Sequence, residues 1–452
     1  MTVSSQSTPA LSRGRLLSLG GLAAVFVTLA WRMHAFVDAN CVNMLFWDQW
    51  DFYIPFFEGR SLWDVFTFQQ GSHRMGIALL LTRGMAALSD WNVRWDAFAI
   101  SFTMMAAALL ALRLATRCGL KLGLGLVAIP LFFFNLRQYE VFVGASNLSH
   151  SSFPVLMLLV CCLAWFWRNT PARLLTLAVL NFLLVFTGYG IFAGVLIPAL
   201  LFLELVQHLR AGRRPEFLWT TAALFACAAA WVVFAQEYIF VGHLEGLNLG
   251  YNKPIEYLYF MGLMLANFLG VPGTGGATLA VGYLFLALLL ATWLWHGLRL
   301  LRLGCEQERI SVVLFFLSSF GLVYVANTAL GRVAFGWEAG AVASRYVPLM
   351  VPGALALLLQ AGLLTNRRLS LGLVALLTVA TAAGTLTLRK DDLSLITWYR
   401  QGRLEWRQAY LATHSIQEAN RRSNFQVFPR DIDERIKYLE KNKLNLFAPS
   451  GH

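Results

Sequence analysis

The amino-acid sequence predicts an all-α, polytopic membrane protein, and three observations support this fold class. Of the 452 residues, 58% are hydrophobic and only 13% are charged, whereas about a quarter of the residues in a soluble domain carry a charge. The mean hydropathy is +0.60. Apolar runs close to the roughly 20 residues that a spanning helix needs recur along the whole chain. A β-barrel is excluded, because its strands would alternate in hydropathy and be only about 10 residues long.

The apolar runs, taken together with the clusters of Arg and Lys between them, predict about eleven spans. They are expected at residues 15–36, 97–116, 122–135, 151–167, 173–187, 190–208, 217–238, 277–296, 310–328, 346–364 and 369–387. This threading places the Arg-rich connections on one side, as the positive-inside rule requires. It predicts an integral inner (plasma) membrane protein with a cytoplasmic N-terminus and an extracytoplasmic C-terminus.

Two further apolar segments must stay on the outer side for this threading to hold. Residues 75–88 form a short segment interrupted by Arg83 and Gly84, and residues 255–271 precede a Pro/Gly-rich stretch. Segments of about 14 residues are more often interfacial than spanning. We therefore expect a transmembrane domain over residues 1–387 with a long first outer loop at 37–96. A small extracytoplasmic C-terminal region, residues 388–452, is expected to cap the outer face.

The net charge of +12 does not indicate a nucleic-acid partner, because most of the basic residues lie in short connections where they act as topology signals. The six cysteines have no spacing typical of a disulfide framework or a metal site. No metal-binding residue is therefore predicted. Outer-loop carboxylates could coordinate a divalent cation, but nothing in the sequence requires a cofactor.

The first outer loop opens on the sequence WDQWD, which contains Asp48 and Asp51. On a helix this spacing places both carboxylates on one face. One interpretation is an aromatic belt, with Trp47 and Trp50 at headgroup depth and two solvated acids. The other is a carboxylate held at the membrane surface as a general base or a substrate ligand, because partial burial would raise its pKa.

Eight more residues in or beside the outer connections are candidates for binding an anionic substrate. Arginine offers a fork of donors that suits phosphate, and charges at membrane depth are usually functional. A snorkelling His–Arg pair at 73–74 and a loop-fixing ion pair of Glu338 remain alternative interpretations. The candidates are His73, Arg74, Arg137, Glu140, Arg332, Glu338, Arg345 and Tyr346.

Several catalytic and transport signatures are missing from the sequence. It contains no Walker A loop, GxSxG elbow, HExxH motif or Cys/His metal pattern. Ionisable residues inside the predicted spans are few, apart from Arg32, Glu204 and His208 near helix ends. A proton-coupled transporter usually needs more such residues.

Together, these features resemble the GT-C superfamily of membrane glycosyltransferases. The matching pattern is a first helix, the acidic WDQWD motif, and a His-containing motif before a juxtamembrane segment (HRMGIALLLTRGMAALSDWNVRW). The resemblance implies two non-spanning helices in the first loop and transfer of a sugar from a polyprenyl-phosphate-linked donor. It also implies an inverting reaction, at the extracytoplasmic face, onto a glycan, lipid or protein acceptor.

The resemblance also implies roles for particular residues. Asp48 would be the general base and Asp51 an alternative base or an orienting group. Arg345, with Arg332 and Arg74, would stabilise the departing lipid phosphate. In many relatives the acids are adjacent, whereas here Gln49 and Trp50 separate them, so the choice between Asp48 and Asp51 stays open.

Two other functions remain alternatives at this point. A flippase or transporter for lipid-linked saccharides would have a polar pathway and paired charges within the spans, which the sequence is expected to lack. A polymerase or ligase of lipid-diphosphate-linked glycans would use the same arginines. In each case the expected partners are a lipid-linked saccharide and membrane lipids, with no nucleic acid.

Overall fold

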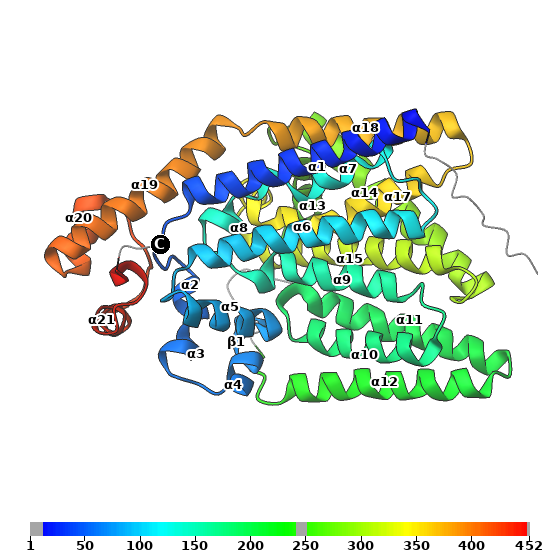
Figure 1. Ribbon diagram of the computed structural model, residues 1–452, viewed down its shortest axis with the longest axis horizontal. Coiled ribbons are helices and arrows are strands. Elements are labelled where there is room, and N and C mark those ends of the chain that lie inside the picture. Colours follow the sequence, from blue (N-terminus) through cyan, green and yellow to red (C-terminus); the bar gives the residue numbers. More distant parts are fainter. Residues whose placement is uncertain (1–11, 241–250, 450–452) are drawn as a thin grey trace, which may run out of the picture.

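The computed structural model describes residues 12–240 and 251–449, and these residues are almost entirely helical. The only strands in this part of the chain are β1 (Gln69–Gln70) and β2 (His73–Arg74), which form a short antiparallel hairpin. The long helices run roughly parallel in a bundle, and a smaller group of helices covers one end of it (Figure 1). We call this smaller group the cap; it consists of residues 42–75 and 390–449.

Seven helices in the described residues are long and apolar enough to cross a membrane. This confirms an all-helical protein of the multi-pass membrane type. The seven are α1 (Arg13–Asn40), α6 (Arg94–Arg117), α11 (Ile191–Arg210) extended by η4 (Gly188–Gly190), α12 (Arg214–Ala235), α14 (Gly276–Leu303), α15 (Arg309–Arg332) extended by η5 (Val333–Phe335), and α18 (Arg367–Leu386).

The other four predicted spans are shorter helices, so the number eleven stays a prediction. At 1.5 Å per residue, a helix of 16 residues is about 24 Å long, less than the roughly 30 Å hydrocarbon core. The segment near 122–135 is broken into η1 (Leu124–Leu126), α7 (Ala128–Phe133) and η2 (Leu136–Gln138). The remaining three are α9 (Ser152–Ala164), α10 (Thr170–Val185) and α17 (Val347–Gly362).

The two segments expected not to span are also short. Residues 75–88 form α5 (Gly76–Leu88), which has 13 residues, and 255–271 form α13 (Ile255–Phe268), which has 14. Each is therefore about 20 Å long. Their length fits the prediction that they lie beside or within the bundle without crossing the bilayer.

The centre of the bundle is formed by α15 and α17. Nearly every residue of α17 is buried, and the two helices approach closely at Gly321 and Gly353. A Cβ on Gly321 would lie 3.0 Å from the Cα of Gly353, so a larger residue would push the helices apart. The peripheral helices α12, α14 and α18 expose large side chains such as Phe225 and Val379, as lipid-facing helices do.

The cap joins the first loop and the C-terminal region into one apolar core. The first loop supplies α2 (Gln49–Phe52), α3 (Ile54–Phe57) and α4 (Leu62–Thr67), and the C-terminal region supplies α19 (Lys390–Thr413), α20 (Ile416–Ser423), α21 (Asp433–Lys441) and η7 (Asn445–Phe447). Trp50 and Val65 from the first loop belong to the same buried cluster as Trp406, Ile436 and Leu446. The C-terminal region and the first loop therefore share one hydrophobic core.

The same end of the bundle carries the short elements that connect the spans. These are α8 (Glu140–Val143), η3 (Leu148–His150), α16 (Trp337–Gly340) and η6 (Ser344–Tyr346). Arg403 of α19 ties α8 to the cap, since its Nη2 donates to the carbonyl of Val143 at 2.7 Å. Most of the residues singled out in the sequence lie in this region.

Candidate functional site

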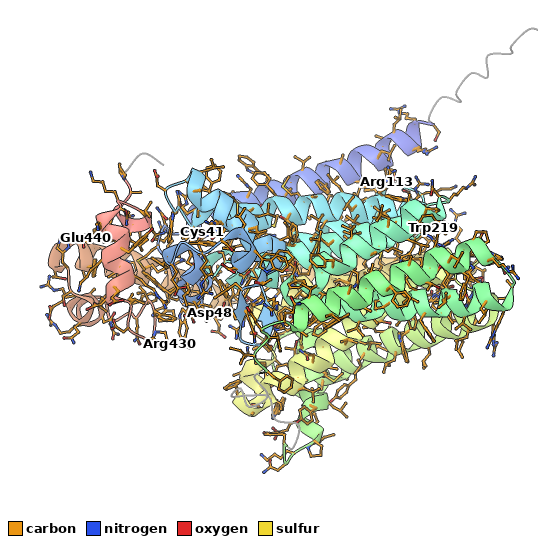
Figure 2. The ribbon with its side chains drawn as sticks, turned by 90° about the horizontal axis from the view of Figure 1, so that it is seen from below. Cys41, Asp48, Arg113, Trp219, Arg430 and Glu440 are labelled. Atoms are coloured by element: carbon orange, nitrogen blue, oxygen red, sulfur yellow. The ribbon has the colours of Figure 1, made fainter. Side chains whose placement is uncertain are left out.

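Asp48 lies at the junction of the cap and the bundle, as the N-cap residue of α2. Figure 2 shows it near Arg430, at the end of the molecule opposite to Arg113. The preceding residue, Trp47, has φ of +48°, which is uncommon for a bulky side chain. The Trp47 amide donates to the carbonyl of Val427 at 2.8 Å. The C-terminal region therefore holds the strained turn that presents Asp48.

The carboxylate of Asp48 lies near three arginines, Arg332 and Arg345 from the bundle and Arg430 from the C-terminal region. Burial raises its pKa, as does the charge of Asp51, while the charges of Arg345, Arg332 and Arg430 act in the opposite direction. The residue is exposed, so its carboxylate is open to solvent at this junction. Within the described residues it forms no ion pair within 4.0 Å. The carboxylate thus interacts electrostatically with these guanidinium groups without being bound by any of them.

Asp51 has different surroundings from Asp48. Its carboxylate lies 3.4 Å from Arg430 Nη1 and 3.7 Å from Arg435 Nη1. Arg435 also donates to the carbonyl of Trp50 at 2.8 Å. These contacts join α2 to the C-terminal region, so Asp51 is held in an ion-pair network of the cap.

Arg345 is positioned by Glu140, which comes from a distant connection. The Arg345 Nη1 lies 3.5 Å from Glu140 Oε1, and the Arg345 amide donates to Glu140 Oε2 at 3.1 Å. The Glu140 amide donates in turn to Ser344 Oγ at 2.9 Å. Burial alone would lower the pKa of Arg345, but the nearby Tyr346 and Glu140 raise it. The guanidinium therefore stays charged while 56% of the side chain remains exposed.

Arg332 is a cation without an acidic partner among the described residues. Its side chain is exposed and lies over the ring of Phe335, with Cζ 5.7 Å from the ring centroid. Its charge lowers the pKa of both His73 and His150. Arg332 is thus the common neighbour of the Asp48 carboxylate and these two imidazoles.

His73 and His150 form an aromatic cluster with Tyr189. The ring centroids of His73 and His150 are 5.3 Å apart, and that of Tyr189 lies 4.6 and 5.4 Å from them. Burial lowers the pKa of His73 to about 4 and that of His150 to about 3, so both are neutral at pH 7. His73 Nδ1 and His150 Nε2 are buried without a hydrogen-bond partner among the residues that the structure describes, which is unusual for buried polar atoms.

Tyr189 and Tyr324, whose rings are 5.2 Å apart, were missed by the sequence reasoning. A signal for Tyr189 exists in the sequence GYG at 188–190, which interrupts two apolar runs. Gly188 has φ of +50°, and a Cβ there would lie 2.1 Å from the carbonyl oxygen of Ser149. Only glycine therefore allows η4 to approach η3 this closely. Nothing local marks Tyr324, which lies within a long apolar helix.

The structure does not bring Arg74 into the site. All three of its guanidinium nitrogens donate to backbone carbonyls: Nε to Phe234 at 3.0 Å, and Nη1 and Nη2 to Thr67 and Gln236. The side chain is buried. Its donors are already used in fastening the β-hairpin to the end of α12, which gives no geometric support to a substrate-binding role.

Arg137 and Glu338 are not among the charges that shift the pKa of Asp48. Arg137 is buried and its Nη2 lies 3.7 Å from Asp392 Oδ2, near the junction of α18 and α19. Glu338 is exposed on α16 and forms no hydrogen bond or ion pair with the described residues. Of the ten residues singled out in the sequence, the site thus gathers Asp48, His73, Glu140, Arg332, Arg345 and Tyr346.

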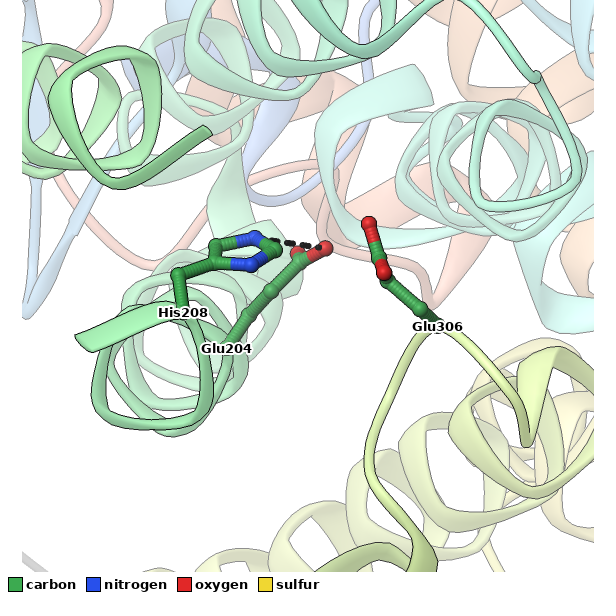
Figure 3. A group of neighbouring side chains, drawn as sticks. All are labelled: Glu204, His208 and Glu306. Carbon is green, nitrogen blue, oxygen red and sulfur yellow. Dashed lines mark ion pairs between the residues drawn. The ribbon is translucent and has the colours of Figure 1, made fainter. Parts of the chain in front are cut away.

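A possible metal-ligand group lies at the other end of the bundle, although the sequence predicted none. Glu204, His208 and Glu306 offer ligand atoms within 4.8 Å of one another, with the first two on α11 and Glu306 on the α14–α15 connection (Figure 3). Sequence spacing does not reveal the group, because Glu306 lies far along the chain.

The charges around this group favour an ion-pair network over a cation site. Arg173 Nη2 lies 2.6 Å from Glu204 Oε1, Arg309 lies 4.0 Å from it, and Arg213 pairs with Glu306. Three guanidinium groups already neutralise the two carboxylates, and a divalent cation would be repelled by them. The expectation that the spans lack paired charges is wrong here, since Arg173 and Glu204 are fully buried.

Comparison with protein-family models, curated proteins and solved structures finds no significant match to this chain. The chemistry of the site therefore rests on the residues themselves. They provide one carboxylate with a raised pKa, two cations beside it, and two neutral imidazoles with unused nitrogens.

Proposed function

We propose that this chain is a membrane glycosyltransferase that moves a sugar from a polyprenyl-phosphate-linked donor onto a hydroxyl group of a glycan, lipid or protein. The observation that carries the proposal is that Arg332 and Arg345 lie near enough to Asp48 to lower its pKa, while no ion pair within 4.0 Å among the described residues holds its carboxylate. A base beside a phosphate-binding pair suits an inverting displacement. On this proposal, the cap end faces the extracytoplasmic side of the inner membrane and the N-terminus lies in the cytoplasm.

The proposed step balances with these residues alone. The Asp48 carboxylate takes the proton of the acceptor hydroxyl while the oxygen of that hydroxyl forms a bond to the anomeric carbon. The bond between that carbon and the phosphate oxygen of the donor breaks, and its electron pair stays on the lipid phosphate. The phosphate gains negative charge, which Arg332 and Arg345 stabilise. A raised pKa makes Asp48 a stronger base than an ordinary surface carboxylate.

Asp48 is the better candidate for the base than Asp51. Asp51 is already held by ion pairs with Arg430 and Arg435, so its carboxylate is engaged within the cap. Asp48 has no such partner among the described residues. Asp51 therefore serves to orient α2 and, through its charge, to raise the pKa of Asp48.

The neutral imidazoles of His73 and His150 suit the recognition of a sugar. A neutral imidazole offers one donor and one acceptor nitrogen, and both rings have a buried nitrogen without a partner. Hydroxyl groups of a sugar ring could satisfy these nitrogens without adding charge next to Arg332. We propose that these two residues contact the transferred sugar.

The alternative of a flippase is not favoured by a specific observation. The fully buried Arg173–Glu204 pair lies beside the inner connections, at the opposite end from Asp48. A ligase or polymerase using a diphosphate donor would employ the same two arginines, so donor specificity separates it from the proposed reaction.

The test uses the purified chain in liposomes with synthetic polyprenyl-phosphate sugars and radiolabelled acceptor extract. Asp48→Asn is expected to lower turnover by about 100-fold or more, the contribution of a general base, while Asp51→Asn keeps most of it. Turnover by Asp48→Asn at the level of the unmodified chain would rule out this role. Movement of the lipid-linked sugar across the bilayer without transfer would overturn the function and support a flippase. Transfer only from diphosphate donors would support the ligase.

A further inference from the structure

A pocket lies at the end of the bundle opposite to Asp48. Its volume is about 370 Å³, and it is built where α6 ends and where α9 connects to α10. Arg113 and Arg117 from α6 line it together with Phe166, Trp167 and Arg168 from the connection. Figure 2 shows Arg113 at the far end of the molecule from Asp48, so this pocket is separate from the candidate site.

The three arginines of this pocket have no acidic partner in the described part of the chain. None of their guanidinium groups forms an ion pair or a hydrogen bond there. The segments that build the pocket contain no Asp or Glu, since none occurs between Asp96 and Glu140 or between Glu140 and Glu204.

Two arginines elsewhere at the same end are neutralised within the chain, since Arg213 pairs with Glu306 and Arg299 lies 2.6 Å from Glu308. What distinguishes the pocket is that three unpaired arginines line one hollow. The helix dipole favours a cation near the end of α6, as at Arg117, but Arg168 lies outside any helix. Arg113 and Arg117 are four residues apart on one helix face, where like charges repel. An anion in the pocket would relieve this repulsion.

We propose that this pocket binds the phosphate group of an anionic lipid headgroup, in the leaflet opposite to the one that Asp48 faces. Arginine recognises phosphate through parallel N–H donors, and basic pockets between membrane helices suit such headgroups. Trp167 is 45% exposed, and aromatic rings of this kind settle at headgroup depth. A lipid is favoured over a free phosphate because Phe166 and Trp167 supply an apolar wall beside the cations.

The test compares three soluble ligands on the purified chain in a non-ionic detergent. Short-chain phosphatidylglycerol, short-chain phosphatidylcholine and inorganic phosphate are titrated while the thermal unfolding midpoint is followed. Phosphatidylglycerol is expected to raise the midpoint at the lowest concentration. Equal potency of inorganic phosphate would overturn the lipid assignment, and no effect of phosphatidylglycerol would overturn the site.

A matched pair of variants separates the pocket from general charge. The pocket variant carries Arg113→Gln, Arg117→Gln and Arg168→Gln. The control carries Arg210→Gln, Arg214→Gln and Arg368→Gln, which removes three exposed arginines that lie at the ends of other helices and do not line the pocket. The apparent affinity for phosphatidylglycerol is expected to fall about tenfold or more in the pocket variant, because several charge-assisted bonds are lost. Equal losses in both variants would overturn the proposal.

A single substitution guards against misfolding of the triple variant. Arg168→Gln leaves α6 unchanged and lies outside any helix. It is expected to weaken phosphatidylglycerol binding by about threefold or more while the ligand-free midpoint stays the same. Unchanged binding in this variant would remove Arg168 from the site and contradict the proposed three-arginine pocket.

Discussion

Asn445 fastens the C-terminal region to the loop that carries Asp48, so replacing it by alanine should release the cap. The side chain is fully buried. Its Oδ1 accepts from the Leu45 amide at 3.1 Å, and its Nδ2 donates to Asn43 Oδ1 at 3.1 Å and to the carbonyl of Trp91 at 2.8 Å. Its φ is +53°, a conformation that asparagine tolerates better than alanine.

The expected cost follows from these contacts. Asn445→Ala removes three buried or partly buried hydrogen bonds, at roughly 1 kcal/mol each. The left-handed conformation adds about 1 kcal/mol. The total is about 3–4 kcal/mol, which raises the population of the opened cap by a factor of about 100 or more.

Limited proteolysis measures this population directly. Trypsin cleaves after Lys441 and Lys443, which lie beside Asn445, and the cleavage rate follows the open population when opening and closing are fast. The control is Asn442→Ala, an exposed residue whose side chain makes one local hydrogen bond, to the carbonyl of Tyr438 at 2.8 Å. Asn445→Ala should be cleaved about 100 times faster than this control. Equal cleavage rates in the two variants would refute the idea that Asn445 fastens the cap.

Four further outcomes are expected. In the proposed reaction the base Asp48 must be ionised, so activity should fall as the pH drops through its raised pKa. Asp51→Asn removes a negative charge and should move this acidic limb of the pH–activity profile to lower pH. An acidic limb at the same pH in Asp51→Asn would contradict the electrostatic coupling of the two carboxylates. Ionised Asp48 is also unfavourable in the folded state at any pH above its unfolded pKa, so Asp48→Asn should melt no lower than the unmodified chain at pH 7. Glu204→Gln should destabilise the fold by about 3–5 kcal/mol by leaving Arg173 buried and unpaired, and added Zn²⁺ should not raise the melting temperature of the unmodified chain. Arg74→Lys should lower the melting temperature, since one ammonium cannot reach three carbonyls. The KM for the donor should stay unchanged. A raised KM with an unchanged melting temperature would place Arg74 in the site.

The sequence alone determined the helical architecture and indicated the connections that contain the candidate site. A spanning helix must satisfy its own backbone hydrogen bonds within lipid, so its length and hydropathy are written locally, and the runs at 15–36 and 310–328 became α1 and α15. The short length of α5 and α13 could likewise be predicted from their local sequence. The exact number of spans could not be predicted in this way, because a broken or short helix such as α7 depends on the neighbouring helices that cover it.

Only the tertiary structure decided which charged residues act together. Asp48 and Arg345 lie in connections far apart in the sequence, and no periodicity links them. Asp48 and Asp51 look alike in WDQWD, yet the C-terminal region forms ion pairs with Asp51, whereas Asp48 is influenced by Arg345 and Arg332 and has no ion pair among the described residues. Arg74 resembles a phosphate ligand in sequence, but its guanidinium group donates its hydrogen bonds to backbone carbonyls. A side chain's role depends on the partners that folding supplies, and those come from distant parts of the chain.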